Sequence, residues 1–434
     1  MESIRLQGLQ QCTGEIHVPG SKSIANRALL MAALCASQDD APALTELTNL
    51  LRSDDTERML EALQALGVGI EFDAANPTTV RVIGCGGHWS QIPQQLYLGN
   101  AGTAMRPLVA VLATTLSSAQ SIELTGDARM QERPIRALVS ALLQADAGIQ
   151  YLAEEGYPPL RIRGGMHSGS ISIDGSESSQ YVSALLMALP LLPHESLLTL
   201  TGTVVSWPYI ELTLAMLERF GIEIHRIAKH EFMIPGGQQY RSPQQYWVEG
   251  DASSASYWLA AGVLGGGPLR VHGIGSASIQ GDVAFAEQLQ AIGGKVTVAE
   301  TYIDVAGGQI HGFDADLNAI PDAAMTFATL ALFAAGPTTI RNIANWRIKE
   351  TDRLAAMATE LRKVGATIEE GSDYIQITPP AVIAHAHIDT YDDHRMAMSF
   401  ALLGFSTAGV TIRDPNCCRK TYPDFFTKFQ QYCH

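Results

Sequence analysis

The sequence predicts an α/β protein of six similar units, grouped into two domains of three units each. Six times a short polar, Gly-rich or charged stretch leads into an Ala-rich apolar run of helical length, at intervals of roughly 70 to 80 residues. A second series of six strand-like segments leads into more amphipathic helices, in register with the first series. A chain of 434 residues that is 46% hydrophobic can fill two ordinary cores.

Each Ala-rich helix is expected to begin at a motif of small or polar residues that suit an N-cap. The six motifs are 20–23 (GSKS), 99–103 (GNAGT), 175–180 (GSESSQ), 250–254 (GDASS), 321–324 (PDAA) and 392–395 (DDHR). Small residues leave the N–H groups of the first turn open to a ligand. Several such helix starts, brought together, would form a site for anions.

The second series places strand ends before the amphipathic helices. Its segments are 49–54, 125–129, 201–206, 272–276, 342–347 and 414–418. Five of these helices are expected to end at a glycine C-cap, at Gly67, Gly148, Gly221, Gly293 and Gly365. The sixth runs into the C-terminus. We expect residues 4–18 to supply its missing strand, so that the two ends of the chain complete one unit.

The polar stretch 235–249 marks the boundary between the third and fourth units. The predicted domains are residues 22–248, and residues 1–21 together with 249–434. The chain therefore crosses between domains twice, near residues 20 and 248. A double crossing of this kind is expected to act as a hinge.

Charge and composition limit the class of partner. A net charge of −15 argues against binding to nucleic acid or to an anionic membrane, so a small-molecule partner is expected. The N-terminal residues lack a signal-peptide pattern and the Ala-rich runs are too short to span a membrane, which predicts a cytoplasmic protein. The six cysteines form no C-x-x-C pair and are expected to be free thiols.

Nine basic residues fall at or near helix starts despite this acidic background. They are Lys22, Arg27, Arg106, Arg129, Arg133, Lys349, Arg353, Arg395 and Lys420. Any one of them alone is more simply a solvated charge at a helix end. Nine in equivalent places favour a pocket for substrates with several anionic groups, because Arg binds carboxylate and phosphate through two hydrogen bonds.

Several chemistries find no support in the sequence. The P-loop and G-x-G-x-x-G spacings are absent, no G-x-S-x-G elbow occurs, and His385 and His387 lack further metal-ligand neighbours, so no metal or cofactor is expected. Acid and base chemistry remains, with Asp322 and Glu350 as candidates because both lie among cations. The structural alternatives are an N-cap for Asp322 and an ion pair with Lys349 or Arg353 for Glu350.

Long motifs in a fixed order carry a resemblance over essentially the whole chain. They are 19–23 (PGSKS) with Asn26 and Arg27, 98–107 (LGNAGTAMRP), 129–135, 178–180 (SSQ), 249–255 (EGDASSA), 349–354 (KETDRL) and 393–398 (DHRMAM). In these motifs the chain resembles the 5-enolpyruvylshikimate-3-phosphate synthases, a family of enolpyruvyl transferases. The resemblance implies two domains of three βαβαββ repeats with buried parallel helices, an inside-out α/β barrel that closes on its substrates.

The resemblance also implies a reaction. The family moves the enolpyruvyl group of phosphoenolpyruvate to the 5-hydroxyl of shikimate 3-phosphate and releases phosphate by addition and elimination. Matching positions assign the hydroxyl proton to Asp322, the methylene carbon to Glu350 and the phosphate side to Lys22 and Lys420. His394 joins these four as a fifth residue implied to be catalytic.

Binding residues follow from the same matches. Those implied for shikimate 3-phosphate are Lys22, Ser23, Arg27, Ser178, Ser179, Gln180, Ser206, Tyr209, Asp322, Asn345 and Lys349. Those implied for phosphoenolpyruvate are Lys22, Asn100, Gly102, Thr103, Arg133, Gln180, Glu350, Arg353, Arg395 and Lys420. Gly102 and Pro107 also match relatives that glyphosate inhibits at the phosphoenolpyruvate site, so glyphosate is an expected inhibitor.

Two alternatives stay open at this point. The related UDP-N-acetylglucosamine enolpyruvyl transferase carries a Cys in a mobile loop, whereas the matching stretch 127–133 here has none. A non-catalytic anion-binding protein on the same repeats would have lost Asp322, Glu350 or Lys22, and all three are present. We expect a monomer, because the two halves of the chain complete one site.

Overall fold

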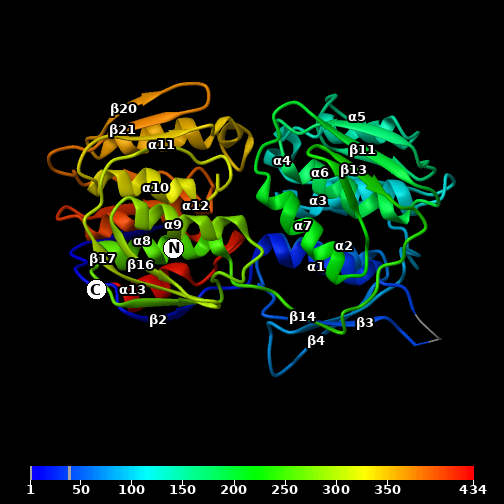
Figure 1. Cartoon of the computed structure of the whole chain (residues 1–434), viewed down its shortest axis with the longest axis horizontal. Helices are drawn as coiled ribbons and strands as arrows, with labels where there is room; N and C mark the ends of the chain where they lie inside the picture. Colours follow the sequence, from blue (N-terminus) through cyan, green and yellow to red (C-terminus); the bar gives the residue numbers. More distant parts are fainter. Residues whose placement is uncertain (1, 38–40) are drawn as a thin grey trace. The chain divides into compact units, whose positions relative to one another are not determined.

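The computed structural model describes residues 2–37 and 41–434, and the chain divides into two compact units (Figure 1). One unit is Gly20–Val248. The other combines the residues up to Pro19 with Glu249–His434. We call them the inserted unit and the terminal unit, since the first is inserted between the two parts of the second.

The inserted unit contains seven α-helices, one 3-10 helix and twelve strands among its described residues. Its helices are α1 (Lys22–Leu34), α2 (Asp54–Ala65), α3 (Gly102–Thr115), α4 (Ala128–Glu132), α5 (Arg136–Leu143), α6 (Ser179–Ala188), η1 (Leu189–Leu191) and α7 (Pro208–Arg219). Its strands are β3 (Leu44–Thr48), β4 (Gly69–Phe72), β5 (Val80–Ile83), β6 (Gln95–Tyr97), β7 (Ser121–Thr125), β8 (Gly148–Tyr151), β9 (Leu160–Arg163), β10 (Ser170–Asp174), β11 (Ser196–Thr201), β12 (His225–Ala228), β13 (Glu231–Ile234) and β14 (Gln245–Trp247).

The terminal unit is built in the same way. Its helices are α8 (Ala252–Leu264), η2 (Gly281–Val283), α9 (Ala284–Ala291), α10 (Ala324–Leu330), η3 (Ala331–Phe333), η4 (Ala344–Ile348), α11 (Arg353–Lys363), α12 (His394–Phe400), η5 (Ala401–Phe405), η6 (Pro415–Lys420) and α13 (Phe425–Tyr432). Its strands are β1 (Ser3–Leu6), β2 (Gly14–His17), β15 (Leu269–His272), β16 (Gly294–Val298), β17 (Tyr302–Gly308), β18 (Asp314–Asp316), β19 (Thr338–Arg341), β20 (Thr367–Glu370), β21 (Ile375–Thr378), β22 (His387–Ile388) and β23 (Val410–Arg413).

Five of the six small sheets share one pairing rule, which confirms the predicted repeats. Five have four strands, in the orders β14-β3-β5-β4, β6-β7-β9-β8, β10-β11-β13-β12, β2-β15-β17-β16 and β18-β19-β21-β20. In each, the first pair is parallel and the next two pairs are antiparallel. Within the described residues these sheets stay open, so the strands form no closed barrel.

The two ends of the chain meet in the sixth sheet, as the repeat count predicts. Its order is β1-β23-β22, with β23 parallel to β22 and antiparallel to β1. Residues 4–18 in fact serve two sheets, because β2 also pairs in parallel with β15. The N-terminal segment thus ties the first and last parts of the terminal unit together.

The Ala-rich helices form the cores, and the sheets lie outside them. Every residue of α10 and α12 is buried, as are nearly all residues of α1, α3 and α8. In the terminal unit β20 and β21 lie on one side of α10 and α12, and β2 and β16 on the other (Figure 1). Within the described parts of the chain, no helix is long and apolar enough to cross a membrane.

Two local expectations need correction. Gly67, Gly221, Gly293 and Gly365 have positive φ as predicted, but Gly148 begins β8 and the left-handed residue after α5 is Asp146, with φ 60°. Asp tolerates this region better than most side chains. The segment after 125–129 forms two short helices, α4 and α5, because Pro134 lies between them and lacks the N–H that a continuous helix needs.

Candidate active site

The six predicted motifs all lead into Ala-rich helices, and three of them cap the helix with a side chain. Ser178, Asp251 and Asp393 accept hydrogen bonds from the backbone N–H groups of Gln180, Ser254 and Arg395. Most of the predicted site residues lie at or near these starts. Because the two units are separate bodies, we describe the cluster in each unit by itself.

Arg353 is the centre of the cluster in the terminal unit. It is the first residue of α11, and its side chain is 1% exposed. Its Nε donates to Asp393 at 2.7 Å, its Nη1 to Asp322 at 2.9 Å and its Nη2 to Glu350 at 2.8 Å. Burial lowers the pKa of Arg353, but these three carboxylates outweigh burial and raise it. The guanidinium is therefore a permanent positive charge shared among three anions.

Asp322 bridges two guanidinium groups. Its Oδ1 accepts from Arg353 and its Oδ2 accepts from Arg395 Nη2 at 3.0 Å, while Lys349 Nζ lies 3.6 Å from Oδ1. Burial raises the pKa of Asp322, but Arg395, Lys349 and Arg353 together hold it well below its usual value. Asp322 is thus ionised at neutral pH. The alternative that it is an N-cap is wrong, because α10 is capped at Ala323.

Two further side chains, Tyr257 and Asp393, hold Arg353 and Arg395 in position. Tyr257 on α8 accepts a hydrogen bond from Arg395 Nη1 at 3.2 Å. Asp393 binds Arg353 and also accepts from the backbone N–H of Arg395 at 2.9 Å, so it orients both cations. The sequence predicted no catalytic or binding role for Tyr257 or for Asp393. The position of Asp393 before the α12 run was a capping signal, whereas nothing in the sequence pointed to Tyr257.

Four other predicted residues belong to the terminal unit. His394 is fully buried, with Nδ1 3.5 Å from an oxygen of Asp393. Asn345 is buried in η4, and Lys420 is the buried last residue of η6. Glu350 is 7% exposed and pairs with Arg353, which is the ion pair predicted as the non-catalytic alternative for this residue. An ion pair with Arg353 also orients the carboxylate, so this pairing is compatible with a catalytic role.

Lys22 begins α1 in the inserted unit and is buried beside a carboxylate. Its Nζ lies 3.3 Å from Asp55 on α2, and both side chains are less than 10% exposed. Asn26, one turn along α1, donates to Thr103 at 2.7 Å and to the carbonyl of Asp55 at 3.3 Å. These bonds join the starts of α1, α2 and α3. Asp55 was missed by the sequence analysis, although it follows directly from the predicted strand end 49–54.

Arg27 is held by neutral groups. Its Nε donates to Thr213 at 2.9 Å, its Nη2 to Ser183 at 3.1 Å and its Nη1 to the carbonyl of Ser23 at 2.9 Å. Burial lowers the pKa of Arg27 to about 10, which leaves it charged at neutral pH. Hydroxyl and carbonyl dipoles solvate this cation but do not neutralise it. The hydroxyls come from α6 and α7, 156 and 186 residues further on.

Arg133 and Arg106 surround the start of α3. Arg133 Nη1 donates to the side-chain oxygen of Asn100 at 2.9 Å and to its carbonyl at 3.2 Å. A Cβ at Gly102 would lie 2.1 Å from Arg106 Nη1 and 3.0 Å from Arg133 Nη2, so only glycine lets both side chains approach the helix start. Arg129 lies apart, pairing with Glu132 at 3.0 Å on the surface of α4.

The remaining predicted residues of the inserted unit lie at the starts of α6 and α7. Ser178 caps α6, Ser179 begins it and is buried, and Gln180 is the next residue. Ser206 is buried with φ 53°, and Tyr209 is the second residue of α7. The left-handed backbone at Ser206 turns the chain from β11 into α7.

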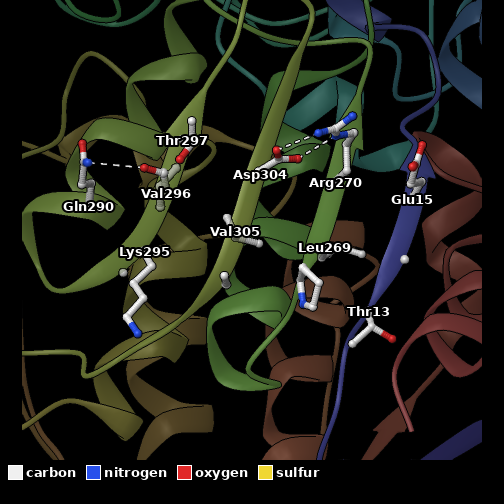
Figure 2. Close-up of a pocket in the computed structure, with 14 residues that line it drawn as sticks. Thr13, Glu15, Leu269, Arg270, Gln290, Lys295, Val296, Thr297, Asp304 and Val305 are labelled. Carbon is white, nitrogen blue, oxygen red and sulfur yellow. Dashed lines mark hydrogen bonds and ion pairs between the residues drawn. The ribbon is translucent and has the colours of Figure 1, made fainter.

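A groove of about 720 Å³ lies elsewhere, on the strands β2, β15, β17 and β16 (Figure 2). Arg270 on β15 and Asp304 on β17 are cross-strand neighbours in it and form two hydrogen bonds of 2.8 and 2.9 Å (Figure 2). None of the predicted site residues is among those that line it. The helix starts, not this groove, therefore define the candidate active site.

Within residues 2–37 and 41–434, no group of three or more His, Cys, Asp or Glu side chains is arranged to hold a metal ion. His385 and His387 have their rings 5.6 Å apart, edge to face, and His385 is bonded to the carbonyl of Ala408.

Comparison with solved structures defines the class of protein. An enolpyruvyl transferase from Streptomyces tendae shares the fold, with a TM-score of 0.77 at 17% identity over 100% of this chain and 98% of that one. EPSP synthase from Acinetobacter baumannii gives a TM-score of 0.80 at 25% identity, over 99% of this chain and 98% of that one. The fold is that of the enolpyruvyl transferases, as expected.

Sequence comparison identifies the family. The sequence model described as EPSP synthase (3-phosphoshikimate 1-carboxyvinyltransferase) matches residues 6–429. Proteins named 3-phosphoshikimate 1-carboxyvinyltransferase are 58% identical over 436 residues in Idiomarina loihiensis, covering all of both chains, and 54% identical over 430 residues in Yersinia pseudotuberculosis, covering 99% and 98%. The chain belongs to the EPSP synthase family. Its predicted function, enolpyruvyl transfer in the shikimate pathway, is confirmed at this level, and the nucleotide-sugar alternative is not favoured.

Proposed function

We propose that this protein transfers the enolpyruvyl group of phosphoenolpyruvate to the 5-hydroxyl of shikimate 3-phosphate, using the side chains described above. Beyond membership of the family, one observation in the structure supports this proposal. Arg353 and Arg395 both bind one carboxylate, that of Asp322, at 2.9 and 3.0 Å. Two guanidinium groups so spaced can equally hold the carboxylate of a substrate, and phosphoenolpyruvate carries one.

The terminal unit supplies the groups that move protons. In its protonated form, Glu350 gives its proton to the methylene carbon of phosphoenolpyruvate, and the substrate hydroxyl adds to the neighbouring carbon while its proton passes to Asp322. Phosphate then leaves as the new methyl group returns a proton to Glu350, which restores the double bond. Asp322 is ionised before the reaction begins, as a base must be, because the neighbouring cations hold its pKa well below the usual value. Lys349 and Asn345 would hold the acceptor beside Asp322.

The inserted unit supplies cations for two polyanions. Arg27, Ser23, Ser178, Ser179, Ser206 and Tyr209 would bind shikimate 3-phosphate, with Gln180 between the two ligands. Asn100, Gly102, Thr103 and Arg133 would receive phosphoenolpyruvate. Support comes from the neutral partners of Arg27 and Arg133, which leave positive charge at buried helix starts. Lys22 and Lys420 would stabilise the phosphate that leaves, and His394 remains a candidate that acts through Asp393.

A second feature of the proposal is inhibition by glyphosate. Glyphosate carries a carboxylate and a phosphonate, as phosphoenolpyruvate carries a carboxylate and a phosphate. Gly102 lets the guanidinium groups of Arg106 and Arg133, which can pair with such anionic groups, approach the start of α3. We expect inhibition that is competitive with phosphoenolpyruvate, measured from initial rates at several concentrations of both. Rates that glyphosate does not change would contradict this part of the proposal.

The test of the function is phosphate release from phosphoenolpyruvate by the purified protein. Shikimate 3-phosphate and UDP-N-acetylglucosamine are offered separately as acceptors, with a reaction lacking acceptor as the control. Release only with shikimate 3-phosphate is expected. Release only with the nucleotide sugar would assign the other transferase activity, and release with neither would favour a non-catalytic anion-binding protein. Cytoplasmic location, a monomeric state and closure of the domains on substrate stay predictions.

A further inference from the structure

A turn immediately before α12 has an unfavourable backbone. The N–H of Asp393 donates to the carbonyl of Thr390 at 2.8 Å, which closes a four-residue turn. Its two central residues, Tyr391 and Asp392, have φ of 55° and 54°. Positive φ at both positions is the type I′ arrangement, which favours Asn and Gly. A tyrosine persists in such a conformation only where neighbouring groups hold it there.

Glu360 on α11 is the group that holds the turn. Its side chain is fully buried, and its Oε1 accepts a hydrogen bond of 2.7 Å from the hydroxyl of Tyr391. Its Oε2 accepts from the backbone N–H of Asp389 at 3.1 Å and pairs with Lys363 at 2.7 Å. Tyr391 is 41% exposed, so its hydroxyl rather than ring burial anchors it. One carboxylate thus fastens the chain on both sides of Thr390.

The same turn leads directly into the cluster around Arg353. Asp393 follows it, binds Arg353 Nε at 2.7 Å and accepts from the N–H of Arg395 at 2.9 Å. Arg353 and Glu360 are seven residues apart on α11, which places them on one face of the helix. Helix α11 therefore contacts the segment 389–395 at two points, through Arg353 and through Glu360. These contacts hold the segment in place, and Arg395 is its last residue.

We propose that Tyr391 and Glu360 are positioning residues for enolpyruvyl transfer, which set Arg395 at the spacing from Arg353 that the carboxylate of phosphoenolpyruvate requires. The inference rests on the proposed function. Both would act through Arg395 and not through contact with a substrate. Loss of the hydroxyl lets the strained turn relax, and the N-terminus of α12 moves with it. Arg395 then meets Arg353 less often in the geometry for bidentate binding.

The test is Tyr391→Phe, which removes one oxygen atom and keeps the ring. The KM for phosphoenolpyruvate should rise about tenfold, as expected for one lost hydrogen bond to a charged group. The KM for shikimate 3-phosphate and the kcat should change little, because the groups proposed for them are held by other contacts. Tyr374→Phe is the matched control, since the Tyr374 hydroxyl also bonds a glutamate, Glu369, at 2.8 Å, in the hairpin of β20 and β21. It should leave all three constants unchanged.

A second variant tests whether Tyr391 and Glu360 act through the same contact. Glu360→Gln retains the shape of the side chain but loses the charge that binds Lys363. If Tyr391 and Glu360 act through one contact, the double variant should raise the KM for phosphoenolpyruvate by less than the product of the single effects. An unchanged KM in Tyr391→Phe, multiplicative effects, or a parallel loss of kcat, both KM values and melting temperature would overturn the inference. An inactive wild-type protein would instead overturn the proposed function, and this inference with it.

Discussion

The two units hold their buried arginines in opposite ways. In the inserted unit Arg27 is bonded to two hydroxyls and a carbonyl, and Arg133 to the amide and carbonyl oxygens of Asn100. In the terminal unit Arg353 is bonded to three carboxylates. Arg27 and Arg133 are thus bonded to neutral groups only, whereas the charge of Arg353 is balanced by carboxylates. Lys22, which pairs with Asp55, is an exception in the inserted unit.

This difference indicates a division of labour. Arginines solvated by neutral dipoles attract polyanionic ligands strongly, because nothing in the site has to be displaced. A balanced network instead keeps ionised carboxylates such as Asp322 in place, where they can take and return protons. We infer that the inserted unit contributes most of the binding of shikimate 3-phosphate and part of the binding of phosphoenolpyruvate. The terminal unit contributes the acid–base chemistry and the pair Arg353 and Arg395 that is proposed to bind the phosphoenolpyruvate carboxylate.

Removal of an arginine from each unit gives the largest expected contrast. Arg353→Met leaves two buried carboxylates, Glu350 and Asp393, and the partly buried Asp322 without their shared cation, which should destabilise the protein by about 3–5 kcal/mol. Arg27→Met leaves only neutral groups and should cost about 1–3 kcal/mol. Thermal unfolding followed by circular dichroism compares the two variants. Equal losses of stability, or a larger loss in Arg27→Met, would break the contrast between the units.

The proposed acid and base residues give the next largest effect. Asp322→Ala and Glu350→Gln should each lower kcat by on the order of 10² or more, within the range of general acid–base groups. Asp314→Ala is the control, because Asp314 also pairs with an arginine, Arg341, but on the exposed surface of the same unit. Near-normal turnover in a folded Asp322 or Glu350 variant would remove that residue from the mechanism.

The helix start at Gly102 tests the inserted unit. The added methyl of Gly102→Ala would meet Arg106 and Arg133, whose flexible ends can move aside, so the fold should survive. Their displacement should raise the KM for phosphoenolpyruvate about tenfold or more, since small misplacements of binding groups are costly. The KM for shikimate 3-phosphate serves as the internal control. Equal increases in both KM values would indicate a general distortion of the unit instead.

The smallest effect concerns pH and Asp322. Its pKa in the folded protein lies below that of the unfolded chain, so its contribution to stability is complete above the ordinary Asp pKa of about 3.9. That contribution is lost as pH falls through the lower folded pKa. Asp322→Asn should therefore lose less stability than wild type between pH values of about 4 and 2. Parallel loss in unfolding measurements would contradict the assigned direction.

Local patterns predicted much of this architecture. The Ala-rich runs fixed the starts of the buried helices because burial on all sides requires small apolar residues, and Asp393 was detectable as a cap because capping is local in sequence. Five of the six sheets keep the full pairing rule, and the pairing of β1 with β23 followed from the count of repeats.

Contacts between distant residues escaped prediction. Tyr257 meets Arg395 138 residues later, and Arg27 meets Thr213 186 residues later. Such pairs depend on how α8 packs near α12, or α1 near α7, and no periodicity in the sequence specifies that packing. The hydrogen bond between Tyr391 and Glu360 was not predicted for the same reason, although Tyr391 precedes the motif 392–395 and Glu360 follows the motif 349–354.

Binding of shikimate 3-phosphate to two variants tests the division of labour most directly. Isothermal titration would compare wild type, Arg27→Met and Glu350→Gln, with folding verified by thermal unfolding. We predict that Glu350→Gln binds shikimate 3-phosphate like wild type although its turnover has collapsed, whereas Arg27→Met binds it at least about tenfold more weakly. Equal weakening in the two variants would show that both units share the binding of this ligand, and would contradict the division proposed here.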